Sequence, residues 1–312
     1  MQLTANGIRL EVEDHGSPHG EPLLLVMGLG MQLLGWHEDL VALLVGRGFR
    51  VIRFDNRDIG LSKSFDHGGV PNLALDSLRY AFGLRVKSPY TLQDMAADAV
   101  GVLDALGIAS AHVCGASMGG MIAQRMAAKF PQRVRSLTLM MTSSGARRLP
   151  GPTLKVRSAM IARPPSQTVE GIVEHYVRLY ALIGSPAYPS APAYLRDRFT
   201  TSVKRSYRPA GTARQMVAIA ADGDRSPVLG SIRMPTRIIH GQADPLVPIA
   251  AGHDLKAKIG GAQIDVVDGM GHDLPAPLYP RFVDVIDGMG HDLPKELWPR
   301  FVAGIAGAAA RA

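Results

Sequence analysis

A Gly-x-Ser-x-Gly pattern at residues 115–119 constrains the fold of this chain more than any other segment. An apolar run at residues 111–114 precedes it, and a helix-like run at residues 121–129 follows it. On such a sharp turn from strand to helix, the hydroxyl of Ser117 is exposed and the N–H of Met118 points to where an oxyanion could form. The pattern therefore predicts a nucleophilic serine. The alternative is a turn serine that only caps the helix.

A nucleophilic serine needs a base and an orienting acid, and the chain supplies both downstream. Residues 237–241 have the pattern of a short buried strand, and Asp244 lies in the turn that follows it. Residues 262–267 have the pattern of another strand, which is followed by a loop containing His272. The sequence therefore predicts a triad with Ser117 as nucleophile, His272 as base and Asp244 as orienting acid.

With this chain order of the triad, the sequence resembles a serine hydrolase of the α/β-hydrolase fold over nearly its whole length. Residues 27–30 follow a strand at residues 23–26, where the family usually has a His-Gly pair. The resemblance implies that the second oxyanion N–H comes from the residue after the glycine, which is Leu29. Met27 replaces the usual histidine, but a backbone donor does not depend on that side chain.

Residues 55–62 resemble the Asp-x-Arg-Gly-x-Gly-x-Ser turn of the same family. Asp58 stands where the family has a glycine. The resemblance implies that this segment braces the loops around the serine turn and does not itself touch substrate.

Strand and helix patterns alternate along the chain, which predicts a mostly parallel eight-stranded sheet with helices on both faces. Residues 1–145 and 228–312 are expected to form this α/β-hydrolase core. Residues 146–227 lack a strong strand pattern and are broken by prolines, so we expect a helical cap inserted after the sixth strand. Such a cap excludes water from the site and gives the pocket its shape.

The C-terminal region contains a tandem repeat, because residues 265–283 and 284–302 are identical at fifteen of nineteen positions. The repeat offers two histidines in the same local sequence, His272 and His291. A compact helix-and-strand crossover leads to His272, whereas the use of His291 would loop out residues inside the sheet. Extra residues are tolerated more easily at a terminus, so His272 is the expected base and His291 the alternative.

Composition excludes some other classes of protein. The chain has 312 residues, 46% of them apolar, and a formal net charge of +7. Its Lys and Arg residues are scattered along the sequence without a basic stripe, so we expect no nucleic-acid partner. No apolar run is as long as a membrane span and no signal-peptide pattern is present, so we expect a cytoplasmic protein without a membrane partner.

Motifs for metal ions and organic cofactors are also missing from the sequence, so none is expected. Cys114 is the single cysteine, which rules out an internal disulfide. The sequence leaves open whether the chain forms a homo-oligomer.

Methionines and a glycine gather around the predicted oxyanion loops, and they suggest an adaptable apolar pocket. The candidate pocket residues are Met27, Gly28, Met31 and Met141. The chain resembles the carboxylesterase and polyketide methylesterase branch, which implies a small-molecule carboxylic ester with an apolar portion as substrate. The same triad would also suit an enol-lactone hydrolase, a carbon–carbon bond hydrolase or a cofactor-free haloperoxidase that makes peracids. A non-catalytic ligand receptor on this fold remains an alternative of another class.

Overall fold

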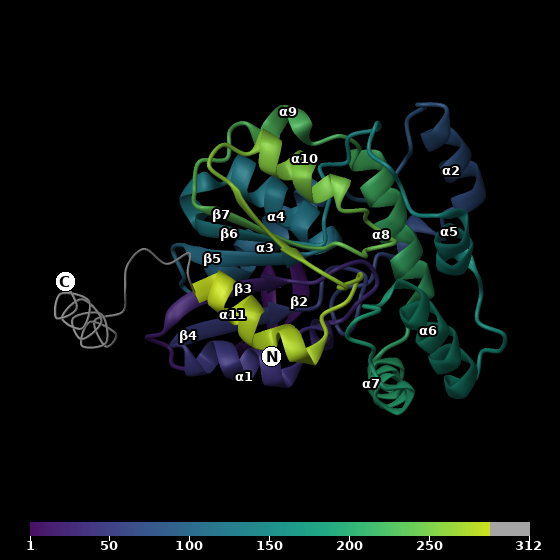
Figure 1. The fold of residues 1–312 in the computed structure, drawn as a ribbon, viewed down its shortest axis with the longest axis horizontal. Helices are drawn as coiled ribbons and strands as arrows, with labels where there is room; N and C mark the ends of the chain where they lie inside the picture. Colours follow the sequence, from purple (N-terminus) through teal and green to yellow (C-terminus); the bar gives the residue numbers. More distant parts are fainter. Residues whose placement is uncertain (288–312) are drawn as a thin grey trace.

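A computed structural model describes residues 1–287, and its eight strands form one sheet (Figure 1). The order across the sheet is β1-β2-β4-β3-β5-β6-β7-β8. β2 pairs antiparallel with β1 and β4, and every other neighbouring pair is parallel. This confirms the predicted eight-stranded, mostly parallel sheet. The strands are β1 (Gln2–Ala5), β2 (Ile8–His15), β3 (Glu21–Val26), β4 (Phe49–Phe54), β5 (Ala111–Ala116), β6 (Val134–Met140), β7 (Thr236–Gly241) and β8 (Gln263–Val267).

The central strands are apolar on both faces because helices cover both sides of the sheet. Along β3, Leu24 and Val26 belong to one core cluster, whereas Leu23 and Leu25 belong to the other. Side chains of a strand alternate between the two faces, so a continuous apolar run fills both cores. This is the pattern expected for a parallel sheet buried in the middle of a protein.

Five helices cover the two faces of the sheet (Figure 1). One core contains side chains of α3 (Leu92–Ala105), α4 (Met118–Lys129) and α10 (Ala250–Lys258). The other contains side chains of α1 (Glu38–Gly46) and α11 (Tyr279–Asp287). Use of His291 as base would have required a replacement strand near residues 282–286, but these residues are helical in α11. His291 itself lies outside the described residues.

Five helices lie between β6 and β7, in the segment for which the sequence predicts a cap. α6 and α7 pack through aromatic rings, since Phe199 lies 5.3 Å from Tyr176 and 4.8 Å from Tyr180 between ring centroids. One further helix, α2 (Leu73–Ala81), lies between β4 and α3 and was not expected from the sequence. The helices of the insertion are α5 (Leu154–Ile161), α6 (Val169–Ile183), α7 (Pro192–Arg205), α8 (Pro209–Asp222) and α9 (Ser226–Leu229).

A buried ion pair ties this insertion to the core. The guanidinium of Arg214, on α8, donates two 2.8 Å hydrogen bonds to the carboxylate of Asp58, and both side chains are almost fully buried. Asp58 has a φ of +73°, a conformation that suits glycine best and that Asp tolerates better than most residues. A carboxylate in the family's glycine position therefore binds a cation of the insertion.

Among residues 1–287, no helix is long and apolar enough to cross a bilayer. Within the same range, no group of three or more His, Cys, Asp or Glu side chains could hold a metal ion.

The ion pair makes a test of stability possible, because Arg214 also pairs with the exposed Asp66 at 2.8 Å. Asp58→Asn leaves the buried guanidinium without its main counter-charge, so we expect the free energy of unfolding to fall by about 3–5 kcal/mol. Asp66→Asn is the matched control and should leave it near that of the wild type, because water screens that pair. Denaturant unfolding of both variants measures the difference, and equal effects would contradict this assignment.

Candidate active site

Ser117 stands on the turn between β5 and α4, and its backbone is strained there. Its φ is +54° and its ψ is −119°, a conformation rarely adopted by residues with a side chain. The flanking glycines permit the turn, because a Cβ on Gly119 would lie 2.0 Å from the carbonyl oxygen of Val26. A Cβ on Gly115 would lie 2.3 Å from the carbonyl oxygen of Gly119. Only bare backbone fits on both sides of the serine.

The structure brings the three predicted triad residues together. The hydroxyl oxygen of Ser117 lies 3.0 Å from Nε2 of His272. Nδ1 of the same imidazole lies 2.7 Å from Oδ2 of Asp244. A carboxylate accepts the proton of Nδ1, which leaves Nε2 as the hydrogen-bond acceptor for the serine hydroxyl. The arrangement has the geometry of a nucleophile, a base and an orienting acid.

Asp244 is held in place by the turn that follows β7. Its Oδ1 accepts hydrogen bonds from the backbone N–H groups of Leu246 and Val247, at 2.9 and 2.8 Å. These two donors stabilise the ionised carboxylate and fix its rotation. Oδ2 is thereby left directed at His272.

A second histidine, His240, contacts the same turn. Its Nε2 lies 2.8 Å from the carbonyl oxygen of Val247 and 3.8 Å from Oδ2 of Asp244. Burial is the main cause that lowers the pKa of His240, so its imidazole is neutral near pH 7. Because a carbonyl only accepts, the proton lies on Nε2, and Nδ1 is buried without a hydrogen-bond partner among residues 1–287.

His272 is positioned by the insertion as well as by the core. Its backbone N–H donates to the carbonyl oxygen of Ile183, at the end of α6, over 2.7 Å. The N–H of the preceding residue, Gly271, donates to Oγ of Ser185 at 2.9 Å. The hydroxyl of Ser185 in turn donates to the carboxylate of Asp273, and burial is the main cause that raises the pKa of this carboxyl. The loop that carries the imidazole is thus fastened on two sides.

The predicted oxyanion loop approaches the serine closely at Gly28, where a Cβ would lie 3.2 Å from that of Ser117. Asn56 holds the loop from the core through a 2.9 Å bond to the carbonyl oxygen of Met27. Within the described part of the chain, the N–H groups of Leu29 and Met118 donate to no protein acceptor. Both remain available for a negatively charged oxygen.

One side chain of the insertion reaches the oxyanion loop directly. The amide of Gln215, on α8, accepts from the N–H of Gly30 at 2.9 Å. The same amide donates to the carbonyl oxygen of Arg57 at 2.9 Å. Gln215 is fully buried and was not singled out from the sequence, because no local pattern marks a residue that acts through contacts distant in the chain.

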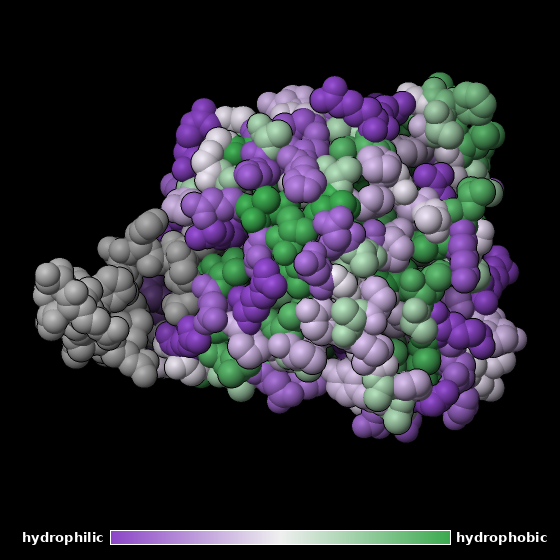
Figure 2. All heavy atoms as spheres, viewed as in Figure 1, coloured by the Kyte–Doolittle hydropathy of each residue, from purple (hydrophilic) through white to green (hydrophobic). Residues whose placement is uncertain are grey.

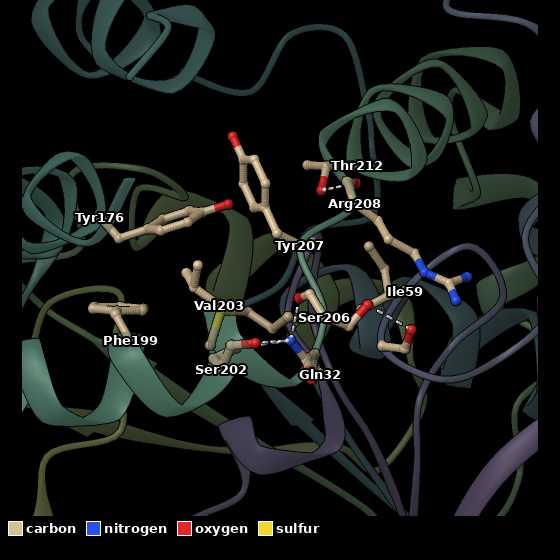
Figure 3. Close-up of a pocket in the computed structure, with 13 residues that line it drawn as sticks. Gln32, Ile59, Tyr176, Phe199, Ser202, Val203, Ser206, Tyr207, Arg208 and Thr212 are labelled. Atoms are coloured by element: carbon tan, nitrogen blue, oxygen red, sulfur yellow. Dashed lines mark hydrogen bonds between the residues drawn. The ribbon is translucent and has the colours of Figure 1, made fainter. Parts of the chain in front are cut away.

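Two cavities lie between the insertion and the core. The smaller, of about 30 Å³, is shown in Figure 3, where the hydroxyl of Tyr176 points toward the ring of Tyr207. The amide of Gln32 forms its floor and donates to the carbonyl oxygens of Ser202 and Ser206. A cavity of this size holds water and is too small for a substrate.

The larger cavity has a volume of about 410 Å³ and lies beside the histidine loop, since Asp273 forms part of its wall. Three tyrosines and one arginine of the insertion contribute to its lining: Tyr180, Tyr188, Tyr194 and Arg198. The guanidinium of Arg198 donates to the carbonyl oxygen of Gly35 at 3.2 Å and lies 5.7 Å from the ring centre of Tyr180. Alanine and proline residues make up most of the remaining lining, so the cavity is mainly apolar, with three tyrosines, one arginine and the carboxylate of Asp273 in its wall.

Of the four candidate pocket residues, Met31 alone lines one of these two cavities. Its sulfur lies 3.4 Å from the hydroxyl of Tyr180. Met27 and Met141 are buried among the core side chains, and Gly28 packs against the serine. The tyrosines and the arginine were missed from the sequence, since the insertion carries no recognisable motif.

Comparison with known proteins adds independent evidence. A family model described as alpha/beta hydrolase fold matches residues 21–275. Rhodomycin D methylesterase DauP of Streptomyces sp. (strain C5) is 27% identical over 290 residues, which are 86% of this chain and 90% of that protein. A 2-hydroxy-6-oxononadienedioate/2-hydroxy-6-oxononatrienedioate hydrolase of Pseudomonas sp. is 28% identical over 252 residues, 78% of each chain.

Among solved structures, the enol-lactonase of Burkholderia xenovorans LB400 superposes with a TM-score of 0.69 at 26% identity. The match covers 93% of this chain and 99% of the enol-lactonase. These three proteins are named as a methylesterase, a hydrolase and an enol-lactonase. The family model, the sheet order and the relatives agree, and the chain belongs to the alpha/beta hydrolase fold family.

Proposed function

We propose that this chain is a serine carboxylic-ester hydrolase that works through an acyl-enzyme on esters with an apolar portion. The hydrogen-bonded line from Ser117 through His272 to Asp244 is the observation that carries the proposal. The methylesterase relative, which is similar over 86% of this chain, supports an ester as substrate.

In the first half of the reaction, Oγ of Ser117 attacks the ester carbonyl carbon and its proton passes to Nε2 of His272. Asp244 accepts a hydrogen bond from the protonated Nδ1 and stabilises the imidazolium that forms. The carbonyl oxygen becomes an oxyanion that accepts from the N–H groups of Leu29 and Met118. When the intermediate collapses, the imidazolium gives its proton to the leaving alcohol and the acyl group stays on the serine.

In the second half, His272 takes a proton from water, and the resulting hydroxide attacks the acyl-serine carbonyl. The second tetrahedral intermediate uses the same two N–H donors. Its collapse returns a proton to Oγ of Ser117 and releases the carboxylic acid. The enzyme is thereby regenerated, and one water molecule is consumed in each cycle.

We further propose that residues 146–227 act as a cap and that the 410 Å³ cavity receives the apolar portion of the ester. Tyrosine rings bury apolar surface well and still offer a hydroxyl for orientation. The contact between the N–H of His272 and Ile183 supports this role, because it joins the cap to the reacting residue. A cap in this position would keep bulk water from the acyl-enzyme.

An experiment can distinguish ester hydrolysis from the other reaction types that the same triad would suit. The enol-lactonase relative favours hydrolysis of a lactone, and the oxononadienedioate hydrolase relative favours cleavage of a carbon–carbon bond. An activity panel of an aryl ester, an enol-lactone, a dienone and peroxide with acetate distinguishes them, and it includes the perhydrolase reaction. The highest kcat/KM should fall on the aryl ester.

The nucleophile is tested by Ser117→Ala. We expect kcat on the aryl ester to fall by roughly four to six orders of magnitude, while the melting temperature stays near that of the wild type. The exposed Ser231 provides the matched control, and Ser231→Ala should retain full activity. A fluorophosphonate probe should label the wild type and fail to label Ser117→Ala. Undiminished turnover by that variant would refute the proposal, and an unlabelled wild type would favour a non-catalytic receptor.

The two histidines of the repeat are distinguished by His272→Ala and His291→Ala on the same ester. We expect the first to reduce kcat by about four orders of magnitude or more and the second to leave it unchanged. The exposed His253 of α10 is a further control, and its replacement by alanine should have no effect. Loss of activity in His291→Ala with a folded, active His272→Ala would reverse the assignment of the base.

The role of Asp244 is tested by Asp244→Asn, which keeps the shape of the side chain. The amide cannot stabilise the imidazolium, and its NH₂ group can hold the imidazole in the unproductive tautomer, so we expect kcat to fall by about four orders of magnitude. The KM should change little because the carboxylate does not touch substrate. Steady-state kinetics measure both constants, and a loss confined to KM would contradict this role.

A further inference from the structure

One end of the molecule exposes an unusual amount of apolar surface. In the described part of the chain, eight of the twelve exposed large apolar side chains lie on residues 70–84 and 154–161. Three of them, Val70, Phe82 and Leu154, are 73–80% exposed. We call seven of these side chains the apolar patch: Val70, Leu75, Leu78, Phe82, Leu84, Leu154 and Ile161.

The two segments of the patch belong to the same end of the molecule although they are far apart in the sequence. α2 and α5 occupy this end in Figure 1, and apolar residues gather over α2 in the space-filling view of Figure 2. Arg147, on the segment that leads to α5, reaches the end of α2, because its guanidinium lies 5.6 Å from the ring centre of Tyr80 and close to Gly83.

α2 turns apolar side chains outward and a charged one inward. Its buried residue is Asp76, whereas Leu75 and Leu78 are exposed. α5 buries Val156 but leaves Leu154 and Ile161 exposed. A surface helix normally buries its apolar side chains, so the exposed apolar residues of these two helices mark an interaction surface.

The patch is bordered by cations and by almost no anions. Residues 145–168 contain no Asp or Glu, and residues 70–90 contain one, Asp76, which is buried and pairs with Arg79 at 3.3 Å. Among residues 1–287, the exposed cations of these segments form no ion pair. They are Arg85, Lys87, Arg147, Arg148, Lys155, Arg157 and Arg163.

We propose that the apolar patch and these seven cations bind the surface of an anionic lipid bilayer. Exposed apolar side chains on helices enter the boundary between head groups and acyl chains, and Lys and Arg around them meet lipid phosphates and carboxylates. Their long apolar stems can lie along the acyl region while the charged ends stay at the head groups. An anionic membrane is favoured over a protein partner because exposed cations without an ion pair lie next to the apolar side chains, and residues 70–90 and 145–168 carry no exposed carboxylate.

This surface goes beyond the proposed reaction. A protein docked through α2 and α5 would sit at the place where esters with an apolar portion accumulate. It departs from the expectation of no membrane partner drawn from the sequence, because the cations belong to two segments that only the fold brings together.

Binding is measured by cosedimentation of the full chain with vesicles of phosphatidylcholine, with and without phosphatidylserine. We expect the wild type to sediment with the anionic vesicles, to remain in solution with the neutral ones, and to be released by salt. A wild type that ignores anionic vesicles at low salt would overturn the proposal.

Two variants separate the contributions of charge and apolar surface. The charge variant combines Arg85→Glu, Lys87→Glu and Lys155→Glu, and we expect it to bind roughly a hundredfold more weakly or worse. The apolar variant combines Leu78→Ser, Phe82→Ser and Leu154→Ser, and we expect a loss of at least about tenfold. Both should retain the wild-type circular dichroism spectrum and wild-type activity on a soluble aryl ester without vesicles.

A matched control carries Lys129→Glu and Lys256→Glu, on exposed positions of α4 and α10 outside the patch. It should bind much more tightly than the charge variant, although it loses net positive charge in the same direction. Ser117→Ala should bind like the wild type, which keeps this proposal separate from the proposed reaction. Equal binding by the wild type and the charge variant would refute the membrane surface. A wild-type dimer that ignores vesicles and dissociates in the apolar variant would replace the bilayer with a second copy of the chain.

Discussion

The close approach of bare backbone around Ser117 is the constraint on which the rest of this site depends. Gly115 and Gly119 leave no room for a Cβ, and the serine between them is held at a strained φ. The core must supply the energy that keeps this turn in place. It does so through the parallel strands on either side, because β3 and β6 pair with β5 up to its last residues. The loops after β7 and β8 then bring the other two residues of the triad to the same edge of the sheet.

The helical insertion contacts both loops that face Ser117. It contacts the histidine loop through Ile183 and Ser185, and it contacts the oxyanion loop through Gln215. Both elements that would act on the reacting carbonyl are therefore connected to the same insertion. A movement of α6 or α8 would displace the imidazole or the N–H donors, so the geometry at Ser117 depends on the position of the insertion.

The sequence contained enough information for the sheet, the serine turn and the order of the three triad residues. Those features depend on local patterns: an apolar run, a glycine pair, and a carboxylate or an imidazole just after a strand. The ion pair of Asp58 with Arg214, the contacts of the Gln215 amide and the cavity with three tyrosines could not be predicted, because each brings together residues from distant parts of the sequence. The exposed face of α2 was missed for another reason. The sequence analysis did not identify this helix, and the periodicity of a helix alone would not reveal which of its faces the neighbouring elements leave exposed.

The carboxylate at position 58 also has a consequence for how such a chain can change over time. Glycine would remove the backbone strain at this position, but it would leave the buried guanidinium of Arg214 without the carboxylate that it binds. An apolar residue in place of Arg214 would likewise leave the buried carboxylate of Asp58 without a cation. A substitution at either position alone would leave a buried charge without its partner. We therefore expect related proteins to keep both residues or to have replaced both.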